Sequence, residues 1–290
     1  MLKIGIVGAE NSHSLAIART LNVEKAVSGV RVVAIWGETR EFAEKAAEGG
    51  KIPRIVKRPA DLIGLADAAV VDHRNGKLHL PAARPLLRAR MPLFIDKPFC
   101  TNVAEGRRFL AEAARLKVPV TSFGVVPLQK SFAEVRREVA ALGAPLTITT
   151  SGPADLFSPY GGVFFYGVHQ ADMLVRLAGL EATHAQVNAS GAGGTGTATV
   201  WFKGGMTATM NLLAKNCPGF HVLAVGEKGI VSRKIENDKN AYLAGIRSFV
   251  KTFRGGGALY SPREILAPIA ILQALGKSLQ TGRREKLPAF

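Results

Sequence analysis

Apolar residues in the first 124 positions gather in short runs, and amphipathic segments separate these runs. The runs predict strands at 2–8, 30–36, 67–73, 92–96 and 119–124. The segments between them carry apolar residues at helical spacing, which predicts helices at 14–22, 40–50, 79–90 and 102–117. Strands that alternate with helices of this length predict a Rossmann-like, doubly wound α/β domain with a parallel sheet covered on both faces.

The pattern changes after residue 125, where strands begin to follow one another directly. Helices are predicted at 127–141, in an apolar segment ending at Gly179, and at 240–253 and 262–280. Strands are predicted at 145–151, 183–190, 197–202, 206–214, 221–226 and 230–236. We therefore expect a dinucleotide-binding domain at 1–124 and, at 125–290, an α+β substrate and oligomerisation domain with a mainly antiparallel, open sheet.

Composition excludes several classes of protein. Hydrophobic residues make up 47% of the 290 positions and the mean hydropathy is +0.14, so a disordered chain is not expected. No apolar run is long enough to span a bilayer, and we expect a cytoplasmic protein without a membrane partner. Cys100 and Cys217 lie far apart without metal-ligand spacing, so neither a disulfide framework nor a metal site is predicted.

The charge of the chain favours anionic partners. The sequence has 38 Lys and Arg against 22 Asp and Glu, a formal net charge of +16. The basic residues are scattered, and aromatic residues do not alternate with them as they do on nucleic-acid-binding surfaces. We therefore expect a small-molecule substrate, with anionic compounds included, rather than nucleic acid.

The stretch "IGIVGAENSHS", residues 4–14, has the context of a dinucleotide-binding turn but not its full pattern. After a strand, the G-x-G-x-x-G motif makes a tight turn and brings backbone close to a diphosphate. Gly8 occupies the first position, whereas Glu10 and His13 replace the second and third glycines. Polar groups of Asn11, Ser12 and the His13 segment still offer donors to a dinucleotide. The alternative is a domain of this fold that has lost its cofactor.

The end of the second strand, "WGETR", bears on the choice between NAD and NADP. NAD-binding proteins place an acidic residue here against the ribose hydroxyls, and NADP-binding proteins use a nearby arginine. Gly37 stands where the acid is expected, and Glu38 follows one residue later. Thr39 and Arg40 form a candidate 2′-phosphate site. The sequence leaves both cofactors open and favours NADP.

A second glycine-rich stretch matches the motif in letters only. Residues 191–196, "GAGGTG", are followed by the β-branched run "TATVWF" instead of a helix. Because a diphosphate site needs the strand-turn-helix context, we interpret this stretch as a hairpin loop.

The stretch "FIDKPF", residues 94–99, puts Asp96 and Lys97 at the end of a buried strand. Burying charge is costly unless a site requires it, and ligands bind at the carboxyl ends of such strands. Pro98 restricts the backbone of Lys97, whose ammonium can stabilise a developing alkoxide. The alternative is a lysine that reaches solvent at a strand end.

In "YGGVFFYGVHQADMLVRLAG", residues 160–179, His169 and Asp172 share one helix face. An imidazole titrates near neutral pH, so His169 is a candidate acid or base. The alternative is a core histidine that bonds to backbone.

These elements together resemble the glucose–fructose oxidoreductase/inositol dehydrogenase (Gfo/Idh/MocA) family across essentially the whole chain. The resemblance rests on the N-terminal strand and Gly8, the "DKP" at 96–98, the G-x-H-x-x-D at 167–172 and the C-terminal helix. It implies an NAD(P)-dependent oxidoreductase acting on a sugar, cyclitol or related hydroxy compound, assembled as a homodimer or homotetramer. Lys97 matches the family lysine that contacts substrate and nicotinamide ribose. The resemblance is also compatible with a cis peptide bond between Lys97 and Pro98. His169 matches the catalytic histidine of the family.

The chain departs from the family pattern at two positions. Phe165 stands four residues before His169, where the family commonly has an aspartate, and Glu10 replaces a glycine. The neighbouring Tyr166 is a candidate phenol for the missing group, and Asp172 is a candidate to orient His169. Two alternatives to net dehydrogenation therefore remain: a cofactor-assisted elimination or glycoside cleavage, and a non-catalytic nucleotide- or sugar-binding regulator.

Overall fold

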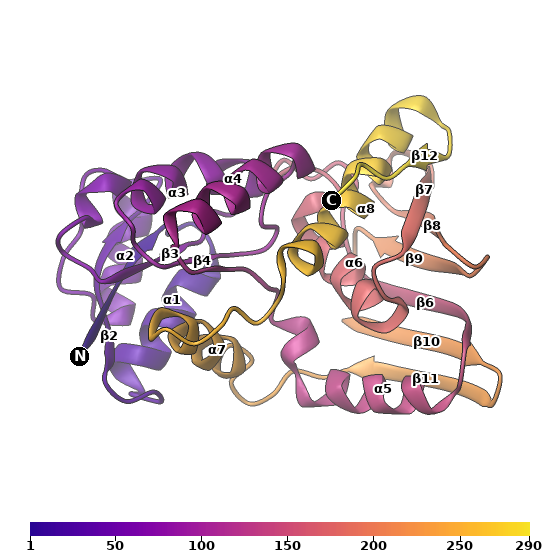
Figure 1. Ribbon diagram of the computed structural model, residues 1–290, viewed down its shortest axis with the longest axis horizontal. Coiled ribbons are helices and arrows are strands. Elements are labelled where there is room, and N and C mark those ends of the chain that lie inside the picture. Colours follow the sequence, from indigo (N-terminus) through magenta and orange to yellow (C-terminus); the bar gives the residue numbers. More distant parts are fainter. The chain divides into compact units, whose positions relative to one another are not determined.

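The computed structural model describes residues 1–290, apart from the side chain of Ala192, and the chain forms two compact units (Figure 1). Unit 1 comprises Met1–Cys100, Glu105–Phe123 and Tyr242–Pro262. Unit 2 comprises Thr101–Ala104, Gly124–Ala241 and Arg263–Phe290.

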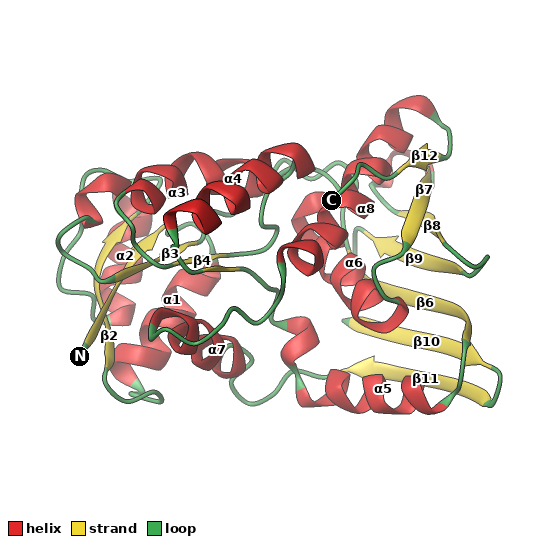
Figure 2. Ribbon diagram, viewed as in Figure 1, coloured by secondary structure: helices red, strands yellow, loops and turns green.

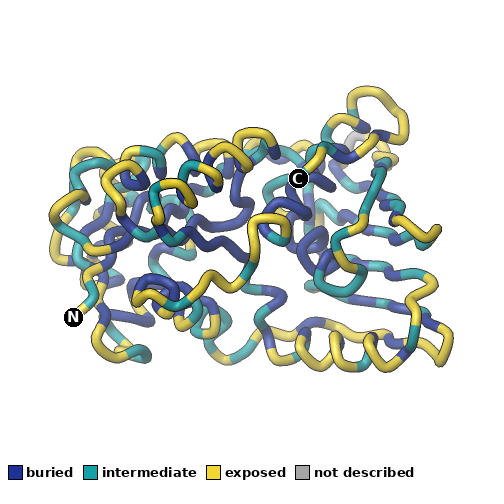
Figure 3. Tube along the Cα trace, viewed as in Figure 1, coloured by how far each residue is buried: buried dark blue, intermediate teal, exposed yellow. Residues whose placement is uncertain are grey.

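The core of unit 1 is a five-stranded parallel sheet with the strand order β2-β1-β3-β4-β5. Its strands are β1 (Leu2–Val7), β2 (Val30–Trp36), β3 (Ala68–Val71), β4 (Leu93–Ile95) and β5 (Val120–Thr121). Every residue of β3 and β4 is buried, and Figure 3 shows these central strands in dark blue. Burial on both faces explains why these strands are continuous apolar runs in the sequence.

Helices cover both faces of this sheet, with α3 and α4 along one face and α1 and α7 along the other (Figures 1 and 2). The helices are α1 (Ser12–Ala18), α2 (Arg40–Gly50), α3 (His79–Arg88), α4 (Val103–Leu116) and α7 (Leu243–Phe253). A π-helical turn at Arg19–Val23 continues α1, and 3-10 turns lie at Pro59–Leu62 and Gly76–Leu78.

Helix α7 belongs to unit 1 although it comes late in the sequence. Its buried Phe249 stacks on Phe94 of β4 at 4.9 Å between ring centroids. The structure therefore differs from the predicted boundary, which placed all of 125–290 in the second domain. An apolar helix face shows that a helix is packed, but not which of two cores it packs against.

Unit 2 is built on a seven-stranded sheet with the order β11-β10-β6-β9-β8-β7-β12. The strands are β6 (Pro145–Pro153), β7 (Ala182–Ala189), β8 (Gly196–Phe202), β9 (Thr207–Leu213), β10 (Phe220–Gly226), β11 (Gly229–Ile235) and β12 (Glu285–Lys286). Neighbouring strands are antiparallel except β6 and β9, which run parallel. The predicted combination of a Rossmann-like sheet with a mainly antiparallel one is confirmed.

Three helices pack on one face of this sheet: α5 (Lys130–Ala141), α6 (Phe164–Ala178) and α8 (Pro262–Thr281) (Figure 2). Buried residues alternate with partly exposed ones along β8 and β9, as expected for a sheet with one covered and one open face. A 3-10 turn also precedes α5 at Val126–Leu128. Among the helices of the described residues, none combines the length and apolar character needed to cross a membrane.

The glycine-rich stretch 191–196 lies between β7 and β8, as predicted from its sequence context. It forms a 3-10 turn at Gly191–Gly193, and the strands on either side pair antiparallel. It therefore connects a hairpin and does not open a helix.

Candidate active site

Gly8 ends β1 at a point where the next parallel strand passes very close. The φ angle of Gly8 is +110°, and a Cβ there would lie 2.6 Å from the carbonyl carbon of Asp72 and 2.8 Å from the amide nitrogen of His73. Only glycine fits this turn, for reasons of both conformation and space. The first position of the dinucleotide motif is therefore structurally intact.

The backbone amides after Gly8 bind a side chain from the end of β2. Glu38 Oε2 accepts hydrogen bonds from the amides of Ala9 at 2.8 Å and Glu10 at 3.0 Å. The other carboxylate oxygen, Oε1, is buried and has no hydrogen-bond partner among the described residues. A buried carboxylate oxygen without a donor is costly, so this position is suited to receive hydroxyl donors from a ligand.

The two residues predicted as a 2′-phosphate site make local contacts instead. Thr39 caps α2, its hydroxyl accepting a hydrogen bond from the amide of Phe42 at 3.1 Å. The Arg40 side chain is 72% exposed and forms an ion pair with Glu44 one turn later. Glu38, Thr39 and Arg40 thus lie together at the end of β2, with the carboxylate turned towards the loop after Gly8.

A hydrogen-bonded cluster lies where β1, β3 and β4 end. The Asn11 amide donates to Asp72 at 2.7 Å and to Asp96 at 3.3 Å. His13 Nδ1 lies 3.0 Å from Asp96 Oδ2, and the Ser14 hydroxyl donates to Asp72 at 2.8 Å. The His13 side chain that replaces the third glycine is therefore part of this cluster.

Lys97 extends the cluster beyond β4. Its Nζ lies 3.8 Å from Asp96 Oδ2, the residue is 7% exposed, and the Lys97–Pro98 bond is cis. Burial opposes charge on Asp96, yet the charges of His13 and Lys97 and the contact with His13 hold the pKa of its carboxyl well below the usual value. Asp96 is therefore an anion that holds Lys97 in place.

Asp72 is a residue of this cluster that the sequence analysis did not select. Burial raises the pKa of its carboxyl well above the usual value, and the charge of Asp96 adds to this effect. The pair therefore holds one proton more readily than two separate carboxylates would. The sequence could have indicated Asp72, because in "VVDH" a charged residue ends a buried strand, as in "FIDK".

His79 joins the segments that follow β3 and β4. Its ring nitrogens lie 2.9 Å from the carbonyl oxygen of His73 and 2.8 Å from that of Pro98. His73 is buried beside Trp36, and burial together with the nearby His79 lowers the pKa of His73 to about 4. Both histidines are thus parts of the framework beneath the cluster.

His169 lies in α6 of unit 2 among aromatic rings. Its ring centroid is 5.5 Å from that of Tyr166 and 5.4 Å from that of Phe220. Phe165 packs edge-on against Tyr166 at 4.9 Å and also contacts Tyr160 at 5.0 Å. The residue is 5% exposed and lies between these rings, and Phe165 stands where the sequence resemblance predicts an aspartate.

Asp172 forms an ion pair with Arg176, one turn further along α6. Its carboxylate binds Arg176 at 2.9 Å, and Arg176 also reaches Glu264 at 3.3 Å. Burial raises the pKa of Asp172, although the Arg176 charge opposes this. These contacts make Asp172 part of an ion-pair network within unit 2, and its role in orienting His169 stays a prediction.

Three side chains of the unit 1 cluster have the spacing of metal ligands. One ligand atom each from His13, Asp72 and Asp96 lies within 4.8 Å of the others. Hydrogen bonds from Asn11 and Ser14 already engage both carboxylates. The cluster is accounted for by these contacts, and the absence of a metal stays a prediction.

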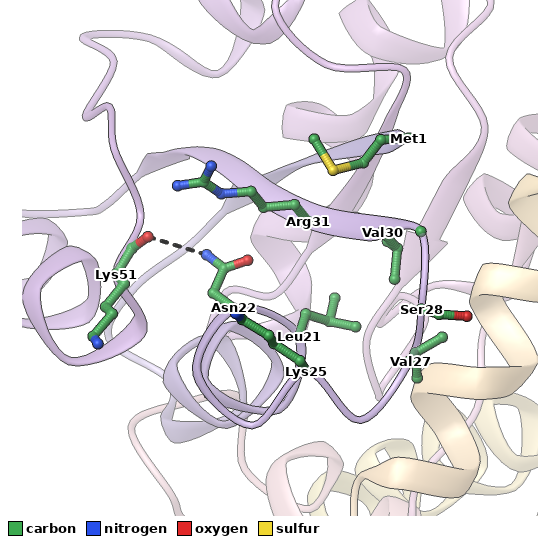
Figure 4. Close-up of a pocket in the computed structure, with 10 residues that line it drawn as sticks. Met1, Leu21, Asn22, Lys25, Val27, Ser28, Val30, Arg31 and Lys51 are labelled. Carbon is green, nitrogen blue, oxygen red and sulfur yellow. Dashed lines mark hydrogen bonds between the residues drawn. The ribbon is translucent and has the colours of Figure 1, made fainter.

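A separate cavity of about 550 Å³ lies at the start of β2, away from the carboxyl ends of the strands (Figure 4). Met1, Leu21 and Val30 line it, together with the basic side chains of Lys25 and Arg31. The chemistry-bearing residues described above do not line it.

Residues 2–123 match the model of an oxidoreductase family with an NAD-binding Rossmann fold, named GFO_IDH_MocA. The matched range covers the parallel sheet, the loop after Gly8 and the Asp96–Lys97 strand end. Residues 2–123 are thus similar to the Gfo/Idh/MocA oxidoreductase family, in agreement with the resemblance seen in the sequence.

Similarity to individual proteins points the same way. YceM of Salmonella typhimurium, which is named an oxidoreductase, is 30% identical over 48% of this chain and 42% of its own length. Inositol 2-dehydrogenase 4 of Saccharopolyspora erythraea is 28% identical over 64% of this chain and 56% of its own length. The chain thus spans about half the length of these curated relatives.

Solved structures share the fold over the full chain. A myo-inositol dehydrogenase from Lactobacillus casei, determined with NAD(H) and myo-inositol, superposes with a TM-score of 0.83. The match covers 100% of this chain and 98% of that one at 16% identity. At 16% sequence identity, this structural similarity establishes the fold of the chain alone.

Proposed function

We propose that this protein is an NAD-dependent oxidoreductase that transfers a hydride between the nicotinamide and a carbon bearing a hydroxyl group. The proposed substrate is a sugar, a cyclitol or a related hydroxy compound, in keeping with the oxidoreductase family that residues 2–123 match and with the inositol dehydrogenase that shares the fold. The observation that carries the proposal is Oε1 of Glu38, which is buried at the carboxyl edge of the parallel sheet without a hydrogen-bond partner among the described residues.

The residues at this edge fit a dinucleotide. Gly8 lets the chain turn tightly against the Asp72–His73 backbone, and Glu38 offers a buried acceptor for ribose hydroxyls. Asn11 caps α1 after this loop, and Ser12 and His13 are the first residues of that helix. Asp96, Lys97 and Pro98 follow β4 at the same edge of the sheet. In the proposed complex these residues hold the cofactor, which supplies the hydride acceptor when bound.

In the proposed reaction Lys97 binds the substrate oxygen and His169 accepts the hydroxyl proton. A buried ammonium stabilises negative charge that develops on oxygen, and Asp96 keeps this ammonium in position. The aromatic rings around His169 hold the imidazole in one orientation, which favours directed proton transfer. Tyr166, 39% exposed beside His169, is the candidate phenol in this site.

We propose NAD rather than NADP as the cofactor. The sequence prediction of NADP rested on Arg40, whose side chain is exposed and paired with Glu44. Glu38 supports the opposite preference, because a carboxylate at the ribose position accepts hydroxyl donors and repels a 2′-phosphate.

The first test is direct binding of NADH and NADPH to the purified protein, monitored by nicotinamide fluorescence after any retained cofactor has been removed. We expect NADH to bind at least tenfold more tightly than NADPH. Glu38→Gln should reduce this difference, and Glu44→Gln is the matched control on the neighbouring helix. Tighter binding of NADPH would reverse the cofactor assignment. Failure of folded protein to bind either cofactor would overturn the oxidoreductase proposal.

A second candidate function is a non-catalytic binding protein of the same fold. It is favoured by one observation, the aromatic surroundings of His169 together with Phe165 in place of an acid. Incubation with NAD and a panel of sugars and cyclitols distinguishes the two functions. NADH formation supports the dehydrogenase, and ligand binding without NADH formation or other turnover supports the binding protein.

We further propose that the protein works in the cytoplasm as a homodimer or homotetramer. The partly exposed face of the unit 2 sheet, along β8 and β9, supports an assembly between copies of the chain. Sedimentation of the purified protein tests this proposal, and a monomer at micromolar concentration would contradict it.

A further inference from the structure

We propose that Arg74 binds the diphosphate of the dinucleotide, and that Glu10 is its counter-ion in the protein before the dinucleotide binds. This inference rests on the proposed function, since it concerns the same cofactor. It explains how the chain can use a loop in which a carboxylate replaces the second glycine of the motif.

The loop after Gly8 lacks part of the usual means of holding a diphosphate. The amides of Ala9 and Glu10 already donate to the carboxylate of Glu38. Glu10 adds a second carboxylate whose side chain is 23% exposed. A diphosphate near this loop would therefore meet two negative charges and fewer amide donors, and it requires a cation.

Arg74 is placed to provide that cation. It follows β3 by three residues, in the segment that passes against Gly8 through Asp72 and His73. Its Nη1 lies 3.8 Å from Glu10 Oε1, and its side chain is 38% exposed. The guanidinium thus lies beside the loop and offsets the negative charge of Glu10, the residue that replaces the second glycine of the motif.

The contact between Arg74 and Glu10 is suited to exchange. An ion pair at 3.8 Å with both side chains partly exposed contributes little stability, so it breaks at low cost. A guanidinium has five N–H donors in a planar fork that matches phosphate oxygens better than a single carboxylate at this distance. Arg74 can therefore bind the diphosphate while it remains close to Glu10.

The test is NADH affinity of the full-length wild-type protein and of Arg74→Gln, Arg74→Lys, Glu10→Gln and the double variant Arg74→Gln/Glu10→Gln. We expect Arg74→Gln to weaken NADH binding about 10- to 100-fold and Arg74→Lys to weaken it less. Glu10→Gln alone should leave the affinity unchanged or raise it a few-fold. In the double variant the affinity should recover part of the loss, because the uncompensated carboxylate is gone.

Two controls make the result specific. Arg88→Gln removes an exposed, carboxylate-paired arginine of α3 in unit 1 and should leave NADH affinity unchanged. Adenosine should bind wild-type protein and Arg74→Gln equally, because it lacks the diphosphate, whereas ADP should show the same loss as NADH. Thermal unfolding of each variant confirms that the compared proteins are folded, and the lysine variant carries the test if the glutamine variant does not fold.

The possible failures are distinguishable. Wild-type protein that binds NADH, with Arg74 variants within twofold of it, would leave the proposed function standing and exclude the role of Arg74. An equal loss for adenosine and ADP would also exclude it, since the effect would not involve the diphosphate. Wild-type protein that binds no dinucleotide would overturn the proposed function and this inference together.

Discussion

Lys97 of unit 1 lies among charged and hydrogen-bonding groups, whereas His169 of unit 2 lies among aromatic rings. Asp96 holds Lys97 through charge, and Asn11 and His13 hold Asp96 in turn. His169 instead contacts the rings of Tyr166 and Phe220, and its helix neighbour Asp172 is engaged by Arg176.

Different forces therefore position the two candidate catalytic side chains. Electrostatic positioning is sensitive to the charge of each partner, because a removed partner leaves a buried ion behind. Aromatic packing is sensitive to shape and tolerates a change of chemistry that keeps the volume. Substitutions in the two regions should therefore separate activity from stability in different ways.

The largest effect is expected for Lys97→Met. The substitution keeps the length of the side chain and removes the ammonium that binds the substrate oxygen, so turnover should fall about 1000-fold. NADH affinity should fall only a few-fold, because Glu38 and the residues at the start of α1 still hold the cofactor. Steady-state NADH formation with the substrate found in the sugar and cyclitol panel measures the first quantity, and fluorescence titration measures the second. Unchanged turnover would exclude the role of Lys97, and Lys45→Met on exposed α2 is the control.

The next effect is expected for His169→Phe. Phenylalanine keeps a ring between Tyr166 and Phe220, so the melting temperature should change little. Turnover should fall about 100-fold, because the proton acceptor is lost. For the aromatic surroundings of His169 we therefore expect loss of activity without loss of stability. A large drop in melting temperature with activity retained would instead identify His169 as a core residue, and His184→Phe in β7 is the control.

Stability should distinguish the two carboxyls of the unit 1 cluster. Asp96→Asn removes the anion that faces both His13 and Lys97, and should lower the free energy of unfolding by about 3 kcal/mol. Asp72→Asn should lower it by less, because burial and the charge of Asp96 oppose charge on Asp72 and raise the pKa of its carboxyl. Urea unfolding at neutral pH measures both. Equal losses for the two variants would contradict the assignment of charge within the pair.

Periodicity predicted most of the fold because the elements are short and regular. Both β2 at 30–36 and α2 at 40–50 were predicted with the bounds that the structure has. Pairing was harder, since the parallel contact between β6 and β9 depends on the whole sheet and leaves no trace in either strand. The sequence did not predict that α7 belongs to unit 1. Phe249 indicates that this helix face packs against apolar residues, but it does not indicate which unit provides them.

The site was predictable where a residue type breaks a local rule. Charges at the end of a buried strand marked Asp96 and Lys97, and the interrupted glycine motif marked Glu10 and His13. Arg74 was not predictable, because an exposed arginine after a strand is ordinary until the structure brings it to Glu10. The sequence also could not predict the ion pair of Asp172 with Arg176, since His169 and Arg176 both lie within one helical turn of Asp172.

The smallest effect is expected for His73 of unit 1, which is neutral in the folded protein although it lies next to the charged cluster. Burial and the nearby His79 lower the pKa of His73 from 6.5 to about 4, so the folded protein holds this imidazole neutral. Between pH 4 and 6.5 the unfolded chain therefore binds a proton that the folded protein does not, and the free energy of unfolding should rise with pH across this window.

His73→Phe, which keeps a ring against Trp36, should reduce the difference between the free energies of unfolding at pH 7 and pH 4.5 by about 2 kcal/mol. Urea unfolding of wild type and variant at the two pH values measures this difference. If the His73 variant keeps the full wild-type dependence, another group titrates in this window, and unit 1 does not hold His73 neutral by burial.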